Sequence, residues 1–338
     1  MISRLFHRWE HHLASVDNNR VVRPFEWGLE WLETFTGDET DETVAALTAW
    51  ADSAVKNSEA FYALPPTGDY ELEGEWLRFP SAVTTPHEVN NTVQARWFPD
   101  ASPKGRRRAV VVLPQWNSDA GGHVGLCRLL NRFGISALRL SLPYHDARMP
   151  AELLRADYIV SANIGRTAQV CRQAVLDARR AVWWLREQGY EALGILGTSL
   201  GSCLAMLTAA HEPLVRAAAL NHISPYFADV IWEGLSTRHV RQGLDGAIDL
   251  ERLRRLWMPI SPFPSLDRLH GKQVLLVYAR YDLSFPVGLS KSLVEEFQRR
   301  GLAPEVAVLP CGHYTTGKTP FKWMDGFTLC RFLNRALG

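Results

Sequence analysis

Residues 194–202 read GILGTSLGS, with one serine between two glycines. The stretch joins the apolar run ALGILG at 192–197 to a second apolar run, LGSCLAMLTAAHE at 200–212. The first run has the length and composition of a buried strand, and the second those of a buried helix. The segment 197–201, GTSLG, therefore lies where a strand turns sharply into a helix, and Ser199 is at the turn.

A serine between glycines fits a flexible loop, a phosphate-binding turn or a strained turn that presents a nucleophile. The phosphate-binding turn is excluded, because no Gly-Lys-Ser/Thr follows and no G-x-G-x-x-G is present. The flexible loop is excluded because apolar elements flank the turn on both sides. The alternative that remains is the strained turn. It places Ser199 at a helix N-terminus, where free N–H groups stabilise a developing negative charge.

A serine hydroxyl becomes a nucleophile when a base takes its proton and a carboxylate orients that base. Asp282 follows an apolar strand in VLLVYARYDLSFP (274–286), and His313 follows the next one in VAVLPCGHYTTG (306–317). The carboxyl ends of parallel strands share one edge of a sheet. The order Ser199, Asp282, His313 thus predicts a catalytic triad at that edge.

Other titratable residues receive a different interpretation. Asp245 and Asp267 fall inside a long connection rather than at a strand end. His222 is expected to line the pocket or support the core, and His145 to be structural or to contact substrate. A metal site on the first helix is not expected, because no HExxH motif is present and the histidines there fit an exposed helix face. These histidines are His7, His11 and His12.

The composition of the 338 residues is that of a globular protein with a formal net charge of +1, which favours no nucleic-acid partner. The basic run at 104–108 is interpreted as a solvated turn. Five scattered cysteines without a CxxC pair argue against a disulfide scaffold and against zinc. No signal-peptide pattern or long apolar stretch is present, so we expect a cytoplasmic protein without a membrane span.

Strands alternate with helices along most of the chain, which predicts a parallel sheet. Residues 1–60 are expected to be helical, with helices over 24–35 and 41–62. Two connections, 144–176 and 224–270, are long enough to cover the ligand-binding edge and are candidate lids. The expected strands are 70–80 and 92–98, both antiparallel, followed by 108–114, 135–143, 192–197, 216–223, 272–280 and 304–310.

With the serine turn at 197–201 and the order Ser199, Asp282, His313, the sequence resembles the α/β-hydrolase superfamily of serine esterases and lipases over 70–338. The resemblance implies an eight-stranded, mostly parallel sheet flanked by helices, and an acyl-enzyme mechanism. It also implies an oxyanion hole formed by the backbone N–H groups of Leu200 and Trp116. In the loop 113–117, LPQWN, the sequence departs from the His-Gly pattern of many relatives, and Asn117 is an alternative donor.

These features predict a helical extension at 1–69 and a hydrolase domain at 70–338. The expected activity is cleavage of a carboxylic ester on a small, hydrophobic acyl substrate, without metal or organic cofactor. Thioesterase, amidase or peptidase, lipase and carbon–carbon hydrolase activities on the same triad stay open, as does a non-catalytic binding protein of this fold. Residues 1–60 are expected to pack outside the sheet or to form an oligomer contact, for example in a homodimer. The aromatic residues of the second candidate lid would line the substrate pocket or pack the lid against the body of the protein. They are Tyr226, Phe227, Trp232, Trp257 and Phe263.

Overall fold

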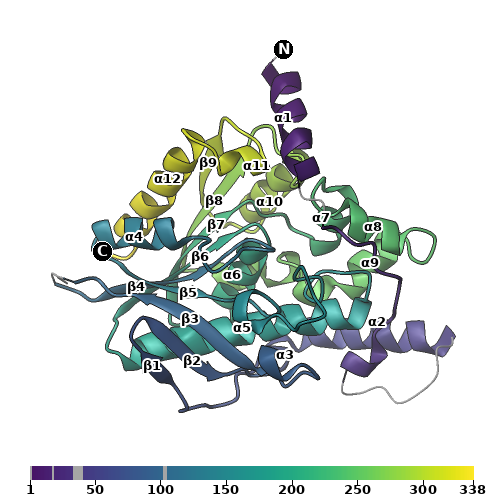
Figure 1. Ribbon diagram of the computed structural model, residues 1–338, viewed down its shortest axis with the longest axis horizontal. Coiled ribbons are helices and arrows are strands. Elements are labelled where there is room, and N and C mark those ends of the chain that lie inside the picture. Colours follow the sequence, from purple (N-terminus) through teal and green to yellow (C-terminus); the bar gives the residue numbers. More distant parts are fainter. Residues whose placement is uncertain (1, 17–18, 33–40, 102–104) are drawn as a thin grey trace.

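The computed structural model describes residues 2–16, 19–32, 41–101 and 105–338. Lys104 of the expected basic turn and residues 33–35 of the expected helix 24–35 lie outside the described residues. Figure 1 shows one central sheet, whose strand order is β1-β2-β3-β5-β4-β6-β7-β8-β9. The strands are β1 (Glu71–Glu73), β2 (Trp76–Pro80), β3 (Thr92–Phe98), β4 (Arg108–Leu113), β5 (Ser136–Leu140), β6 (Ala192–Thr198), β7 (Val215–Asn221), β8 (Gln273–Ala279) and β9 (Glu305–Leu309).

The sheet is mostly parallel, as expected. The six strands from β5 across to β9 run parallel, whereas β1, β2 and β3 pair antiparallel at one edge. The expected single strand 70–80 is instead a hairpin, because Gly74 turns the chain back with a φ of 61°. The sheet therefore has nine strands in the described chain rather than eight, and β1 is a three-residue addition.

Helices cover both faces of the sheet, so β4 is buried on both sides, and its sequence is continuously apolar for that reason. Val111 packs into the core that contains α5 and α6, whereas Val110 and Val112 pack into the core that contains α4 and α12. Burial on both faces favours an unbroken run of branched side chains. The α-helices of this body are α4 (Val124–Arg132), α5 (Ile164–Glu187), α6 (Leu200–His211), α10 (Val287–Arg299), α11 (His313–Thr316) and α12 (Phe321–Ala336).

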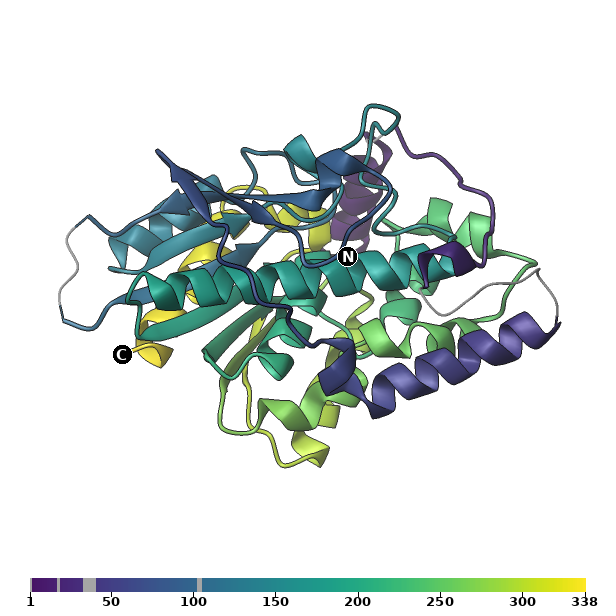
Figure 2. The ribbon, with the colours of Figure 1, turned by 90° about the horizontal axis from the view of Figure 1, so that it is seen from below.

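The N-terminal part of the chain contains α1 (Ile2–Val16), α2 (Asp41–Lys56) and α3 (Ser58–Phe61). Figure 2 shows α5 along the sheet and α2 beside the helices of the later insertion. There Arg255 Nη2 lies 2.7 Å from Asp52 Oδ2 of α2. The described helices include none that is long and apolar enough to cross a membrane.

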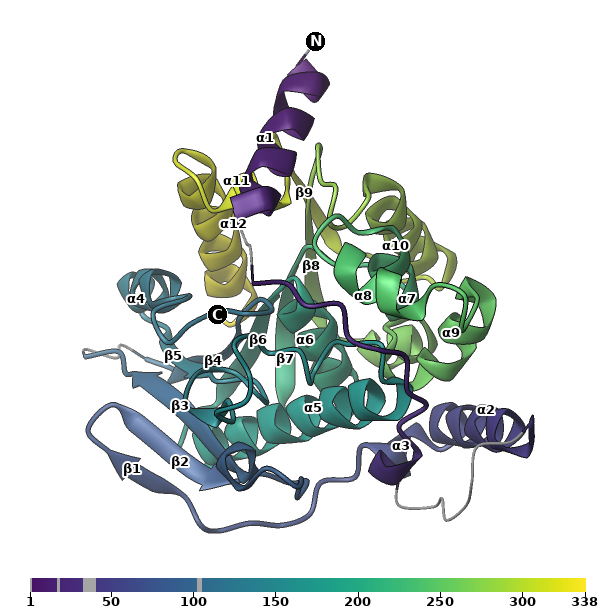
Figure 3. The same ribbon diagram turned by 45° about the vertical axis from the view of Figure 1, so that its right-hand side comes forward.

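The expected helix over 24–35 is wrong where the structure describes it. Residues 24–28 are not helical, and only the short 3₁₀ helix η1 (Leu29–Trp31) forms. The Glu26 N–H donates to Ala162 O at 3.1 Å, and Ile164 N–H donates to Glu26 O at 2.9 Å. These contacts with the start of α5 satisfy the backbone outside a helix. Residues 19–28 cross the molecule in extended form (Figure 3).

The two long connections differ in structure. The expected insertion 144–176 is shorter than predicted, because α5 begins at Ile164 and its buried face packs on the sheet. The connection 224–270 is helical throughout much of its length. It contains α7 (Phe227–Glu233), α8 (Arg238–Leu244), α9 (Leu250–Leu256) and the 3₁₀ helices η4 (Met258–Ile260) and η5 (Phe263–Leu269). Two further 3₁₀ helices are η2 (Glu88–Asn91) and η3 (Asp146–Arg148).

Candidate active site

Ser199 lies at a sharp turn between β6 and α6. Its backbone has a φ of 57° and a ψ of −121°, a conformation that costs of order 1–3 kcal/mol for a residue with a side chain. The Ser199 N–H donates to Asn221 O at 2.8 Å, which ties the turn to the end of β7. A Cβ at Gly197 would overlap the carbonyl oxygen of Gly201, and a Cβ at Gly201 would overlap that of Leu113. Close backbone contacts thus require both glycines of the motif.

Asp282, in the loop after β8, accepts hydrogen bonds from two histidines. Its Oδ2 lies 3.1 Å from His313 Nδ1 and 2.8 Å from His222 Nδ1. A carboxylate only accepts hydrogen bonds, so both imidazoles donate through Nδ1. Its Oδ1 accepts the N–H groups of Ser284 at 2.8 Å and Phe285 at 2.7 Å. Four donors therefore fix the carboxylate in one orientation.

The electrostatics of this cluster favour an ionised Asp282. Burial by itself would raise the pKa of Asp282, but the charge of His313 and the hydrogen bonds from both histidines lower it well below its usual range. Burial opposes a charge on His313 as well, yet Asp282 and Glu10 raise the pKa of His313 above its ordinary value. For His222, burial and the charge of His313 lower the pKa. His313 is thus the imidazole of the two that gains a proton more readily.

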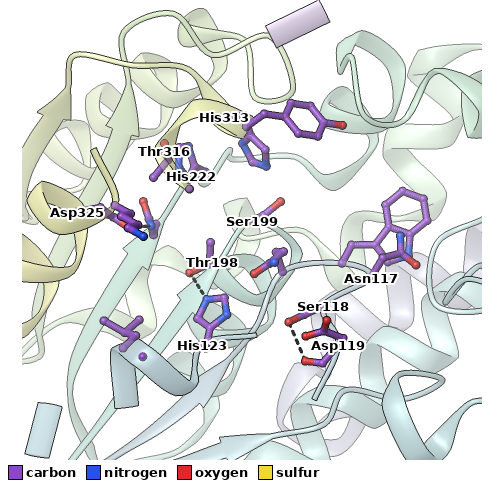
Figure 4. Close-up of a pocket in the computed structure, with 18 of the residues that line it drawn as sticks. Asn117, Ser118, Asp119, His123, Thr198, Ser199, His222, His313, Thr316 and Asp325 are labelled. Atoms are coloured by element: carbon purple, nitrogen blue, oxygen red, sulfur yellow. Dashed lines mark hydrogen bonds between the residues drawn. The ribbon is translucent and has the colours of Figure 1, made fainter. Parts of the chain in front are cut away.

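His313 and Ser199 line the same cavity, and Figure 4 shows the imidazole beside the serine hydroxyl. Within the described residues, no hydrogen bond joins the two side chains; in serine hydrolases this bond often tightens only in the complex with substrate. The side chain of His313 is 14% exposed, whereas that of His222 is 1% exposed. His313 is therefore the more accessible of the two histidines.

The loop after β4 lies against the N-terminus of α6, beside Ser199. The Asn117 N–H donates to His145 Nε2 at 2.9 Å, and Asn117 Oδ1 accepts the Ala156 N–H at 2.8 Å. His145 Nδ1 lies 2.9 Å from Pro143 O, and burial lowers the pKa of His145 to about 4. Neutral His145 therefore holds Asn117 in place, which supports the structural interpretation of His145. Trp116 lines the pocket next to Ser199.

The cavity that contains Ser199 has a volume of about 1060 Å³ and extends between α4 and α12. A second, narrower pocket of about 40 Å³ meets it at Ser199 and Trp116. Tyr226 and Phe227 line this narrow pocket, whereas Trp257 is fully buried and packs edge to face against Phe227. Tyr226 and Phe227 thus line a pocket, whereas Trp257 packs inside the connection 224–270.

The polar wall of the large cavity contains residues that the sequence did not single out. His123 Nε2 lies 3.0 Å from Thr198 Oγ1, and burial lowers the pKa of His123 to about 4. Asn221 donates to Asp325 Oδ2 at 2.9 Å, and burial raises the pKa of Asp325 to about 7. Figure 4 shows Asp325 near His222 and Thr316. His123 is therefore neutral at neutral pH, and Asp325 keeps its proton to a higher pH than an ordinary carboxyl group does.

The remaining candidates lie away from this cluster. Asp245 pairs with Arg241, and Asp267 pairs with Arg300, each with more than half of its carboxyl side chain exposed. His11 and His12 are exposed on α1. All five cysteines are described and free. Among the described residues, the ligand atoms of His222, Asp282 and His313 lie within 4.8 Å of one another, close enough to hold a metal ion.

The topology and the strand-to-helix serine turn are those of the α/β-hydrolase fold. The chain is similar to an acylaminoacyl peptidase of Pyrococcus horikoshii, at 14% identity and a TM-score of 0.59, over 80% of this chain and 42% of that one. It is similar to acetyl xylan esterase 1 of Thermoanaerobacterium sp., at 14% identity and a TM-score of 0.60, over 93% of this chain and 100% of that one.

A Pyrococcus furiosus esterase is also similar, at 14% identity and a TM-score of 0.53, over 95% of this chain and 100% of that one. At such low identity these likenesses show the fold. The chain spans less than half the length of the peptidase. No protein-family model and no curated protein sequence matches the chain.

Proposed function

We propose that the chain is a serine hydrolase that cleaves a carboxylic ester through an acyl-enzyme on Ser199. The observation that carries the proposal is a strained serine at a strand-to-helix turn that shares a cavity with a histidine hydrogen-bonded to a buried aspartate. His313 acts as the general base and acid, and Asp282 orients it. The similarity of the fold to esterases, a peptidase and a lipase is consistent with this chemistry.

In the proposed reaction, Ser199 Oγ attacks the acyl carbon while His313 Nε2 takes the hydroxyl proton. The oxyanion that forms accepts hydrogen bonds from the backbone N–H groups of Leu200 and Trp116. His313 then gives the proton to the departing alcohol, and the carbon–oxygen bond of the ester breaks. A water molecule, deprotonated by His313, releases the acid and restores Ser199. Asp282 stabilises the imidazolium at each step.

We also propose where the two halves of the substrate bind. The acyl group fits the narrow pocket, which is walled by apolar side chains of α7 such as Val230 and Ile231 and by Phe285. The alcohol lies in the large cavity. Because the narrow pocket is small, the substrate is an ester of a short acid. Residues 224–270 form the lid over this pocket, residues 70–338 the hydrolase domain, and residues 1–69 an N-terminal extension.

A hydrolysis screen tests the proposal. The substrates are p-nitrophenyl esters with acyl chains of rising length, a thioester and an anilide, each measured with the wild type and with Ser199→Ala. We expect acetate and butyrate to be hydrolysed best and Ser199→Ala to be inactive. If the thioester or the anilide is turned over faster than the esters, the protein is a thioesterase or an amidase instead. Absence of Ser199-dependent turnover on every substrate would indicate a binding protein.

A further inference from the structure

Helix α1 touches the body of the molecule at the turn that carries His313. Figure 3 shows the C-terminal end of α1 beside α11, with the rest of the helix extending outward. Glu10 is fully buried there. Its Oε2 accepts the Tyr314 N–H at 2.9 Å, and its Oε1 accepts the Thr315 N–H at 2.9 Å and the Thr315 hydroxyl at 2.8 Å. Three hydrogen bonds therefore join one carboxylate to the two residues after His313.

The turn of α11 needs such a partner. The first N–H groups of a helix have no acceptor within it, and a side chain at the N-cap usually supplies one. The residue before His313 is Gly312, which has no side chain, and a Cβ there would overlap the Glu10 carboxyl group. The Gly312 N–H instead donates to Thr315 Oγ1 at 2.7 Å, and that hydroxyl donates to Glu10. Glu10 thus caps the turn on both sides of His313.

The same helix contacts the loop of the acid. Phe6 stacks on Tyr281, with ring centroids 4.6 Å apart, and Tyr281 directly precedes Asp282. The Tyr281 N–H donates to Cys311 O at 2.9 Å, which links this loop to the strand end before His313. Helix α1 therefore rests on both loops that bring Asp282 and His313 together.

We propose that Glu10 is a positioning residue for the base, and that α1 is part of the active site rather than an appendage. The inference rests on the proposed function, because the proposed function assigns His313 the role of the base. Glu10 acts in two ways. It fixes the backbone on which the His313 ring is mounted, and its negative charge stabilises the protonated imidazole.

The charge of Glu10 makes the second effect measurable. The titratable groups that face His313 are Asp282 on the loop after β8, His222 after β7 and Glu10 on α1. Arg20 donates to the Tyr314 hydroxyl at 2.7 Å next to the turn. Burial works against a charge on His313, while Asp282 and then Glu10 raise the pKa of His313. Removing the Glu10 charge must therefore lower that pKa, and a neutral base then persists to lower pH.

The experiment compares full-length wild type, Glu10→Gln, Glu10→Ala and Arg8→Gln in p-nitrophenyl acetate hydrolysis from pH 5 to 9. Arg8→Gln is the matched control, because Arg8 is exposed on the same helix. We expect the acidic limb of the kcat/KM profile to move to lower pH in Glu10→Gln. In Glu10→Ala, we expect kcat to fall up to about 100-fold with little change in KM, the loss that a misplacement of about 1 Å brings. Arg8→Gln should match the wild type.

Two results overturn the inference while the proposed function stands. One is an active wild type whose acidic limb and kcat are unchanged in both Glu10 variants. The other is an equal change in Arg8→Gln. Circular dichroism and thermal unfolding identify a variant that fails to fold. Glu10→Gln keeps the size of the side chain and decides the question if Glu10→Ala unfolds. A wild type without Ser199-dependent turnover would instead refute the proposed function.

Discussion

Replacing Asp282 by asparagine separates the chemistry of the carboxylate from its place in the fold. The Ser284 and Phe285 N–H groups donate to Oδ1, so the amide oxygen of an asparagine must occupy that position. The amide NH₂ then faces His313 Nδ1 and His222 Nδ1, where Oδ2 lies in the native protein. Each Nδ1 has to accept rather than donate. The proton of His313 moves to Nε2, which can no longer take the proton of a serine.

The expected loss follows from this tautomer. In a serine protease triad, the equivalent Asp-to-Asn change lowers kcat about 10⁴-fold, which corresponds to about 5 kcal/mol of transition-state stabilisation. Asp282→Asn should show a loss of this size in p-nitrophenyl acetate hydrolysis. The fold should persist, because the two backbone hydrogen bonds to the side chain remain.

Asp267→Asn is the matched control for this prediction. The substitution is the same, from aspartate to asparagine, but 67% of the Asp267 side chain is exposed. Asp267 Oδ2 lies 3.1 Å from Arg300 Nη1 at the surface. A surface ion pair of this kind contributes about 0–1 kcal/mol. Kcat and thermal stability should be unchanged. Retention of more than about a tenth of kcat in a folded Asp282→Asn would refute the reasoning about the tautomer.

Three further predictions concern His313, His222 and the buried ion pair of Arg148 with Asp177. The acidic limb of the kcat/KM profile should have its midpoint above the ordinary imidazole pKa of 6.5, because the pKa of His313 is raised and activity grows as pH rises through it; a midpoint below 6.5 contradicts this. His222→Gln should lower kcat about 10- to 100-fold, the value of one hydrogen bond to a charged group, and less than His313→Gln does; an equal loss would make His222 the base. Arg148→Met should destabilise the fold by about 3–5 kcal/mol in urea unfolding, because it leaves the fully buried Asp177 without its ion pair; a smaller change would show that the site relaxes.

The parallel part of the sheet was predictable because strands buried on both faces have continuous apolar sequences. The runs at 108–114 and 272–280 correspond to β4 and β8 within one or two residues. The serine turn between β6 and α6 was predictable for a related reason. Two glycines and a serine between a buried strand and a buried helix leave few structures that avoid backbone overlap.

The N-terminal segment could not be predicted from its own pattern. The aromatic residues of 24–35 have helical spacing, yet Phe25 and Trp27 pack against the body from a non-helical backbone. Phe25 and Trp27 contact each other edge to face, and Gly28 adopts a left-handed conformation against Asn163. Tertiary contacts with a segment more than 130 residues away determine this structure, and no local signal contains them.

Among the neighbours of Ser199, Asp282 and His313, one had a signal in the sequence and another had none. The sequence places His222 at a strand end like Asp282 and Ser199, and this position was the available signal for its contact with Asp282. Glu10 carries no such signal. Its partner Thr315 lies 305 residues further along the chain. The residues next to Glu10 in the sequence do not indicate that its carboxylate caps another helix. Contacts of this kind depend on where the fold brings α1, which local patterns do not determine.

Fluorophosphonate labelling tests the central claim, that Ser199 is an activated nucleophile, most directly. The probe reacts with a serine only when a base removes its proton, and peptide mass spectrometry of the labelled protein identifies the modified residue. We predict a single adduct on Ser199 in the wild type, none in Ser199→Ala, and strongly slowed labelling in His313→Gln. A folded wild type that stays unlabelled, or an adduct on another serine, would contradict the account.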